Sequence, residues 1–344
     1  MRKILFCTTA FSLIFASACK NDSMNNKDIK PPVAIKIPTE IETHGDIRID
    51  NYFWMRLSDE QKNAKIKDEQ TTKVLDFLNA ENDYYNQITA HTNDFQSSLF
   101  EEMKSRIKED DESVPYKKNG YFYITKYEKG QQYPIYTRKK ESLDAEEALL
   151  FNVNELAEGH DYFQLGGLNV SPNNELVAFS VDTISRRQYV LHIKNLKTGK
   201  VYDDVITNTN GGSVWANDNK TLFYTKKDPV SLRSYKIYKH VLGTSESDDV
   251  EVFHESDDTF GTFVTKSKSN KYIIIGSYST VSSEYQFLDA DTPNGTFQTI
   301  QKRERNLEYD IAHYNDHFYI RTNKDGAINF KLMKTPVTKT SKEN

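Results

Sequence analysis

The chain is 344 residues long, 37% of them hydrophobic and 28% charged, with 45 Lys and Arg against 50 Asp and Glu. Its 19 Phe, 21 Tyr and 2 Trp exclude a disordered chain, because disordered segments have too few apolar side chains to offset the entropy of ordering. The formal net charge of −5 argues against a general nucleic-acid binder, which needs a basic surface to displace counterions from phosphates. We therefore expect a folded protein with one large domain or two smaller ones.

The first 18 residues have the pattern of a secretory signal peptide. Arg2 and Lys3 provide a positive start, Ile4–Phe15 form an apolar run, and Ala16–Ala18 offer small residues for cleavage. The apolar run is too short to span a membrane as a helix. We therefore expect residues 1–18 to be removed on export.

The next residue, Cys19, resembles the cysteine of a bacterial lipobox, which is lipidated and becomes the mature amino terminus. Ala16 departs from that pattern, because such boxes usually carry Leu there. An ordinary secretory signal that is cut nearby stays open as an alternative. We expect Cys19 to be the lipidation site and residues 19–32 to form a polar, lipid-anchored linker. The protein would then lie in the bacterial cell envelope, periplasmic or attached to the outer membrane, with membrane contact only through the lipid.

Metal and cofactor chemistry finds little support in the sequence. The only cysteine besides Cys19 is Cys7, which lies in the signal peptide, so we expect no disulfide, catalytic thiol or cysteine-bound zinc. His313 and His317 have a spacing that suits a metal on a helix, but they flank a predicted turn between strands, where their side chains diverge. No glycine-rich phosphate loop occurs. We therefore predict no metal and no cofactor site.

Residues 33–112 are predicted to form an N-terminal strap followed by two helices. The segment 33–66 is irregular, and its rings at Tyr52–Trp54 suggest a strap pressed onto a larger body. Apolar residues then recur at helical spacing in 70–91 and 93–108, without an intervening Gly or Pro. Both segments are amphipathic, so we expect each helix to cover another surface.

From residue 113 to 344 apolar and polar residues alternate with a period of two, as in β-strands, and similar segments recur along the chain. Five segments share a turn with Asn or Asp followed by a hydrophobic strand; they begin at Asn119, Asn174, Asn219, Asn270 and Asp316. A second strand follows each and carries a ring near its start, at Tyr133, Tyr189, Tyr235, Tyr285 and Phe330. Third strands are expected at 148–153, 200–206, 249–255 and 297–303, and inner strands are clearest at 166–172 and 212–218.

A four-stranded unit that recurs about every 45–55 residues is typical of a β-propeller blade. One blade cannot bury both of its faces alone, so blades stack on one another and the ring closes. A β-sandwich also has alternating strands, but it would not hold one ring at nearly constant register across five units. We therefore predict a mainly β fold with an incomplete propeller over 113–344, in which the fifth unit lacks its outer strand.

The sequence resembles the oligopeptidase B group of the prolyl oligopeptidase family of serine peptidases. The resemblance runs from about Pro31 to Lys342 in collinear segments, among them THGDIRIDNYFWMR, FLNAENDYYNQITAHT, LFEEMKSRIKEDDESVPY and RRQYVLHIKNLKTG. It implies an N-terminal helical segment, a propeller of typically seven blades and a C-terminal α/β-hydrolase domain, with the propeller capping the active site and restricting entry to short peptides. This chain would then hold about five of the expected seven blades, and the hydrolase domain would be absent from it.

No catalytic residue can be carried over from this resemblance. The nucleophile of such a hydrolase lies in a G-x-S-x-G turn, and that motif does not occur in the 344 residues. The nearest string, Gly211-Gly212-Ser213, falls in a predicted inner strand, where we expect a structural serine. The triad, and the acidic residues that select Arg or Lys, are implied to lie in the hydrolase domain.

Two functions from different classes stay open. In the first, the chain is the N-terminal gating region of a serine endopeptidase that hydrolyses short peptides after Arg or Lys, with short basic peptides as partners, and it is inactive alone. In the second, it is a non-catalytic propeller lipoprotein that binds peptides or a protein partner. The acidic runs 109–112, 248–249 and 257–258 could steer cationic peptides, although such runs are more often solvated loop tips.

Overall fold

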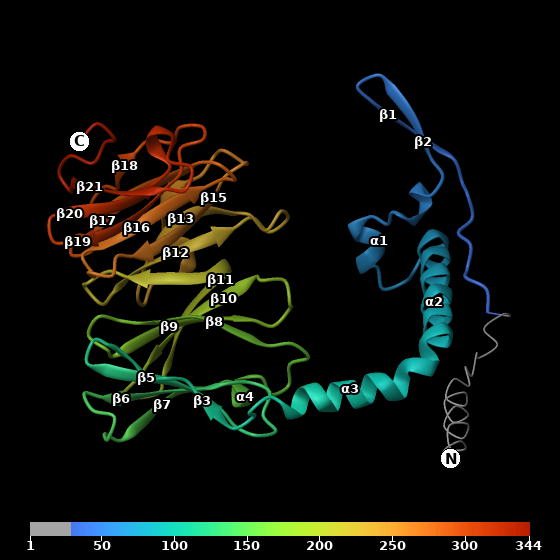
Figure 1. The fold of residues 1–344 in the computed structure, drawn as a ribbon, viewed down its shortest axis with the longest axis horizontal. Coiled ribbons are helices and arrows are strands. Elements are labelled where there is room, and N and C mark those ends of the chain that lie inside the picture. The colour runs from blue at the N-terminus through green and yellow to red at the C-terminus, as the bar shows by residue number, and fades with distance from the viewer. Residues whose placement is uncertain (1–28) are drawn as a thin grey trace, which may run out of the picture. The chain divides into compact units, whose positions relative to one another are not determined.

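The computed structural model describes residues 29–344, which belong to two compact units, Met1–Lys108 and Glu109–Asn344 (Figure 1). The predicted signal peptide, the Cys19 lipidation site and most of the predicted linker lie outside the described residues. Within the described range, no helix is both long enough and apolar enough to cross a membrane.

The first unit begins with a β-hairpin. β1 (Thr39–Thr43) pairs with β2 (Asp46–Asp50) in antiparallel register, and His44 and Gly45 form the turn with φ of 56° and 80°. These left-handed values are those of a two-residue hairpin turn. The prediction of an irregular strap was therefore wrong for this stretch, because mostly polar, exposed side chains hide the strand alternation. Two short helical turns follow, η2 (Phe53–Met55) and α1 (Asp59–Asn63).

The two predicted helices are confirmed as α2 (Glu69–Thr89) and α3 (Asn93–Ser105), which the 3-10 turn η3 (Ala90–Thr92) connects. Asp68 fixes the start of α2, because its side chain accepts a hydrogen bond of 2.7 Å from the Thr71 N–H. Of the described residues in this unit, only Thr71 and Val74 are buried. The periodic apolar residues in and just after α3 are 41–68% exposed; they are Phe95, Leu99, Phe100, Met103 and Ile107, and we call them the α3 apolar face.

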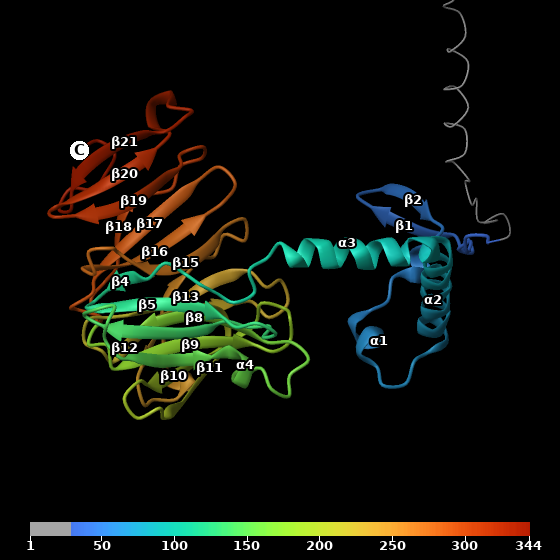
Figure 2. The same cartoon turned by 60° about the horizontal axis from the view of Figure 1, so that its bottom comes forward.

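The second unit is a series of antiparallel sheets, which we number as blades 1 to 5 (Figures 1 and 2). Blade 1 contains β4 (Tyr116–Lys118), β5 (Tyr121–Tyr127), β6 (Ile135–Lys140) and β7 (Glu147–Asn152), with β3 (Asp111–Glu112) beside β5. After the short α4 (Val153–Leu156), blade 2 contains β8 (Gln164–Val170), β9 (Leu176–Asp182), β10 (Tyr189–Asn195) and the first part of β11 (Val201–Trp215). Within each of these two blades, consecutive strands from β4 onward pair in antiparallel order.

Blade 3 contains the second part of β11, β12 (Thr221–Lys227), β13 (Ser234–Val241) and β14 (Val250–His254), with η4 (Glu246–Asp248) before β14. Blade 4 contains β15 (Gly261–Lys266), β16 (Tyr272–Tyr278), β17 (Ser283–Asp289) and β18 (Gln298–Gln301). Blade 5 has three strands, β19 (Tyr309–Tyr314), β20 (His317–Thr322) and β21 (Lys331–Pro336), with η5 (Lys324–Gly326) before the last. Within residues 29–344 the fifth unit has three strands, as the repeat predicted.

The repeated turn has one physical cause in all five blades. The residue that leads into the second strand is an Asn with φ between 48° and 65°; these residues are Asn119, Asn174, Asn219, Asn270 and Asn315. Asn tolerates this left-handed conformation better than other side chains, because its short amide can hydrogen-bond locally. In blade 5 this residue is Asn315, one position before Asp316, where the fifth segment was predicted to begin.

β11 serves two blades as one continuous strand, whereas the sequence predicted separate strands at 200–206 and 212–218. Its first part pairs with β10 and its second part with β12. The strand changes blades next to Gly211, which has a φ of +91°. The backbone of Gly167 approaches it so closely that a Cβ on Gly167 would lie 1.7 Å from the Gly211 carbonyl oxygen. Both positions therefore require glycine.

The apolar core lies between successive blades. Tyr123 and Phe151 of blade 1 pack in one cluster with Val177 and Phe179 of blade 2. Further clusters join blade 2 to blade 3, blade 3 to blade 4, and blade 4 to blade 5. Stacking of sheets face to face around such clusters is the packing of a propeller. The predicted mainly β, partial propeller after a helical segment is confirmed.

Candidate functional site

Hydrolytic chemistry by a serine requires a hydroxyl that contacts a base, and a base that an acid orients. Ser213 lies in β11 with only 3% of its surface exposed, and its Oγ has no hydrogen-bond partner. A serine without a neighbouring base is not activated. The structure therefore gives Ser213 no role as a nucleophile.

A second serine does contact a histidine. Ser269 Oγ, in the turn before β16, lies 2.8 Å from His313 Nδ1 in β19. Burial lowers the pKa of His313, so its ring is neutral, but its Nε2 is buried without any partner and no carboxylate orients it. Ser269 also shares a hydrogen bond of 2.8 Å with Ser267. The contact ties a turn of blade 4 to blade 5 and does not make a triad.

The reverse combination, a histidine with acids but no serine, lies at the junction of blades 2 and 3. His240 Nδ1 is 2.7 Å from Asp249 Oδ1, and its Nε2 is 3.6 Å from Asp204 Oδ1. The Tyr224 hydroxyl donates to the other oxygen of Asp249 at 2.9 Å. All four side chains are buried. We call this group the His240 staple; with no exposed imidazole surface it cannot receive a substrate.

The charge of the His240 staple follows from its geometry. Burial is the largest influence on the pKa of His240 and lowers it, but Asp249 and Asp204 together outweigh burial and hold the pKa above its ordinary value. An imidazolium between two carboxylates compensates buried charge that would otherwise be costly. Asp249 is therefore no solvated loop tip, in contrast to the exposed Asp257 and Asp258.

The histidine pair considered as a metal site does not converge. His313 precedes the Asn315 turn and faces Ser269, whereas His317 follows that turn and pairs with Pro336 of β21. Across residues 29–344, no group of three or more His, Cys, Asp or Glu side chains is placed to hold a metal ion.

A hollow of about 710 Å³ lies where inner strands of four blades converge. Residues in or next to β4, β8, β11 and β15 line it, which places it on the axis of the propeller. Its charged lining residues are all lysines, namely Lys117, Lys118, Lys266 and Lys268. We call it the axial hollow.

Lys266 is the least hydrated of these lysines. Its Nζ donates to the Trp215 carbonyl oxygen at 2.8 Å and to Asn217 Oδ1 at 2.6 Å. Burial, with some repulsion from Lys118, lowers the pKa of Lys266 to about 8. Sequence reasoning missed this cluster, because Lys118 and Lys266 belong to different blades and no local motif connects them.

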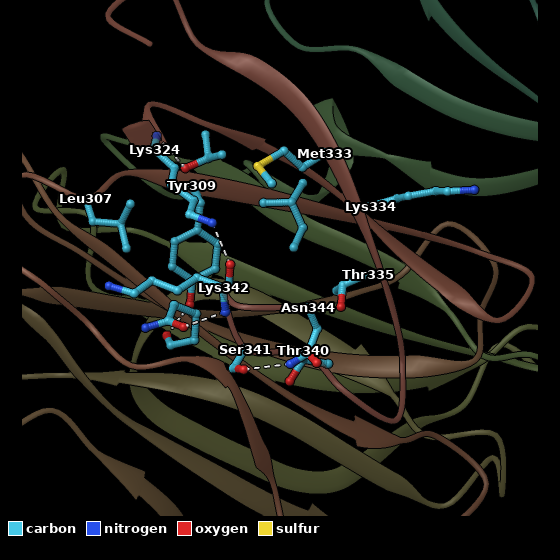
Figure 3. A pocket seen from close by; sticks show the side chains of 13 residues that line it. Leu307, Tyr309, Lys324, Met333, Lys334, Thr335, Thr340, Ser341, Lys342 and Asn344 are labelled. Carbon is cyan, nitrogen blue, oxygen red and sulfur yellow. Dashed lines mark hydrogen bonds between the residues drawn. The ribbon is translucent and has the colours of Figure 1, made fainter. Parts of the chain in front are cut away.

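A much smaller cavity, of about 40 Å³, lies beside blade 5 near the end of the chain (Figure 3). Leu307, Tyr309 and Met333 line it, and its polar groups are bonded to each other, as in the hydrogen bond of 2.8 Å from Asn344 Nδ2 to Ser341 Oγ. It has room for one or two water molecules. We therefore regard it as a packing crevice and not as a functional site.

Comparison with known proteins shows which family shares this architecture. Residues 32–344 match the family model of the N-terminal β-propeller domain of prolyl oligopeptidase. The chain is 38% identical to dipeptidyl aminopeptidase BI of Pseudoxanthomonas mexicana, over 99% of this chain and 46% of that protein. It is 32% identical to Protease 2 of Moraxella lacunata, over 90% of this chain and 44% of that protein.

The chain is also similar to solved structures of the same family. Oligopeptidase B from Leishmania major superposes with a TM-score of 0.81 and 31% identity, over 91% of this chain and 45% of that one. Oligopeptidase B from Trypanosoma brucei, with covalently bound antipain, gives a TM-score of 0.78 and 28% identity, over 90% and 45%. The chain spans just under half the length of the curated relatives that it matches. Together with the helical segment and the stacked blades, these matches show that the chain belongs to the prolyl oligopeptidase family and corresponds to its N-terminal β-propeller domain.

Proposed function

We propose that this chain is the gating propeller of a serine peptidase that hydrolyses short peptides after Arg or Lys. The observation that carries this proposal is the likeness of 91% of the chain to oligopeptidase B from Leishmania major at 31% identity. In this proposal the catalytic triad and the acidic groups that select a basic side chain belong to a hydrolase domain outside these 344 residues. The propeller limits access to short, unfolded peptides, and the 344 residues alone hydrolyse nothing.

The α3 apolar face supports this proposal. Its side chains lie on neighbouring turns of α3 or just after it and are 41–68% exposed, and on α2 Leu78 and Tyr85 are 49% and 61% exposed. Apolar residues at this density are typical of a surface that another protein part covers. We propose that the hydrolase domain covers them.

A second candidate specificity is the removal of dipeptides from a free amino terminus. It is favoured by the 38% identity to dipeptidyl aminopeptidase BI, because that match extends over 99% of this chain. The two candidates differ in one chemical requirement: an aminopeptidase needs the free amine of its substrate, whereas an endopeptidase does not.

Three measurements test these proposals. The gene should continue in frame beyond the codon for Asn344 and encode a G-x-S-x-G turn; an immediate stop codon would favour the non-catalytic binding protein instead. The product of the continued frame should cleave a chromogenic Arg peptide with a blocked amino terminus. Cleavage only of peptides with a free amino terminus would support the dipeptidyl aminopeptidase.

Residues 19–344 alone should release no product, and turnover abolished by Ser269→Ala would contradict their predicted inactivity.

We further propose that the protein is an exported lipoprotein of the bacterial cell envelope, anchored through Cys19. Support comes from the leader pattern, with a positive start, an apolar run and small residues before the cysteine. Cells that express the full chain should incorporate labelled palmitate into it, and Cys19→Ser should abolish the label. Cys7→Ser, inside the leader, is the matched control and should leave labelling intact. Equal labelling of both variants would refute the anchor.

A further inference from the structure

The charged residues that line the axial hollow are four lysines, and no carboxylate is among its lining residues. Lys117 and Lys118 come from blade 1, and Lys266 and Lys268 come from blade 4 or the turn that follows its inner strand. Like charges from distant parts of a chain repel one another, so their convergence on one cavity disfavours the empty state. A concave surface lined by one sign of charge also concentrates ions of the opposite sign.

The position of Lys266 is fixed before any ligand arrives. Two of the three N–H groups of its ammonium are used by Trp215 O and Asn217 Oδ1, at 2.8 and 2.6 Å. One N–H is left for a ligand in the hollow. A cation that is already held in place loses less entropy on binding than a mobile surface lysine does.

The acidic residues nearest to Lys266 are occupied elsewhere. Asp218 and Asp291 both favour its charged form. However, Asp218 accepts hydrogen bonds from Thr221 and the Lys220 N–H, and Asp291 accepts one of 2.8 Å from Asn217. Neither residue lines the hollow. The lysines there consequently lack a carboxylate partner within the cavity.

From this geometry we propose that the axial hollow is a binding site for a small oxyanion, with Lys266 and Lys118 as its principal contacts. The α-carboxylate of a short peptide is the source that fits the proposed function, and this choice of source rests on that function. Inorganic phosphate shares the same chemistry. A peptide would meet the hollow with its carboxyl end, because cationic side chains are repelled by the four lysines.

Anion binding should depend on pH in a defined direction. Because the pKa of Lys266 lies at about 8 in the free protein, raising the pH through this value removes a positive charge from the hollow. A bound anion favours the charged ammonium, so binding raises that pKa and takes up a proton. Affinity should therefore be highest below pH 7 and fall as the pH rises past 8.

Trp215 provides the readout, because it lines the hollow and its carbonyl holds Lys266. The only other tryptophan is Trp54, so the full chain with Trp54→Phe reports on Trp215 alone. Trialanine with a free carboxylate should change its emission saturably at pH 6.5, and at pH 9.5 the affinity should be at least fivefold lower. The C-terminal amide of trialanine should give no change. Inorganic phosphate, titrated separately, shows whether a simple oxyanion suffices.

Variants separate the site from general charge effects. Lys118→Met, at an exposed position, should weaken the response at least fivefold without affecting the fold, and Lys266→Met should abolish it. Lys129→Met, in an exposed turn outside the hollow, is the matched control and should leave binding unchanged. An equal response to the amide, or equal effects of Lys118→Met and Lys129→Met, would overturn the proposal. These titrations measure no hydrolysis, so they stand or fall separately from the peptidase assignment.

Discussion

The two units of this chain differ in what specifies their structure. In the second unit every blade packs on its neighbour, and side chains such as Phe223 and Ile237 are completely buried. In the first unit α2 and α3 have good local signals, but the described residues bury only Thr71 and Val74. A helix can thus be specified by its cap and its periodicity without having a core of its own. The comparison indicates that the stability of the described chain resides in the propeller, whereas the helices leave apolar side chains exposed.

The largest expected effect tests the propeller core. Phe223→Ala removes a ring with no exposed surface from the cluster between blades 3 and 4, and should lower the free energy of unfolding by about 4 kcal/mol, because it leaves a cavity in a packed interior. Urea denaturation followed by far-UV circular dichroism measures it. A loss below about 1 kcal/mol would show that the blades are loosely packed and would remove the contrast with the helices.

The His240 staple should have the next largest effect. His240→Gln leaves Asp204 and Asp249 buried without their cation and should cost about 3 kcal/mol. The exposed His254 provides a matched control, since His254→Gln should change stability by less than about 0.5 kcal/mol. Equal stabilities of the two variants would show that the staple contributes nothing to the junction of blades 2 and 3.

The His240 staple also predicts a pH dependence. Because the folded pKa of His240 is above its ordinary value, its stabilisation is complete below the unfolded pKa and is lost as the pH rises through the folded one. The groups that face it are Asp204, Asp249 and Tyr224, with Glu246 acting on Tyr224 from nearby. Thermal melts from pH 6 upward should show the wild type losing more stability than His240→Gln. Parallel curves would contradict this assignment.

A smaller effect is expected at the left-handed turns. Asn315 has a φ of 51°, so Asn315→Ala should cost about 1 kcal/mol, because a Cβ without a local hydrogen-bonding group is strained there. Asn315→Gly relieves that strain and should stay within about 0.5 kcal/mol of the wild type. Chemical denaturation of both variants measures the difference; equal losses would mean that the turn conformation does not explain the repeated Asn.

The smallest effect belongs to the first unit. Phe100→Ala makes the same change as Phe223→Ala, but at a side chain that is 62% exposed, and should alter the stability of the chain by less than about 0.5 kcal/mol. If the α3 apolar face docks on a hydrolase domain, the same substitution in the whole peptidase should reduce stability or activity. A large effect in the 344-residue chain itself would mean that this face is already covered.

Much of this fold could be predicted from the sequence, because its strongest signals are local. The Asn turn and the alternating strand after it repeat within each blade, and the helical spacing in α2 and α3 is continuous. The inner strands β15 and β19 were missed, because polar residues such as Thr262 and His313 take buried positions in them and weaken the apolar alternation. The burial of Asp249 was also missed, since it depends on His240 and Tyr224 in neighbouring strands. The axial hollow combines Lys118 with Lys266, which only closure of several blades brings together.

The passage of β11 from one blade to the next has a mechanical consequence. A single stretch of backbone, Val201–Trp215, supplies hydrogen bonds to both neighbours, so neither blade can shift without straining the other. Blades 2 and 3 should therefore melt together as one cooperative block. The other seams between successive blades, where only loops pass between separate sheets, should open before this block does.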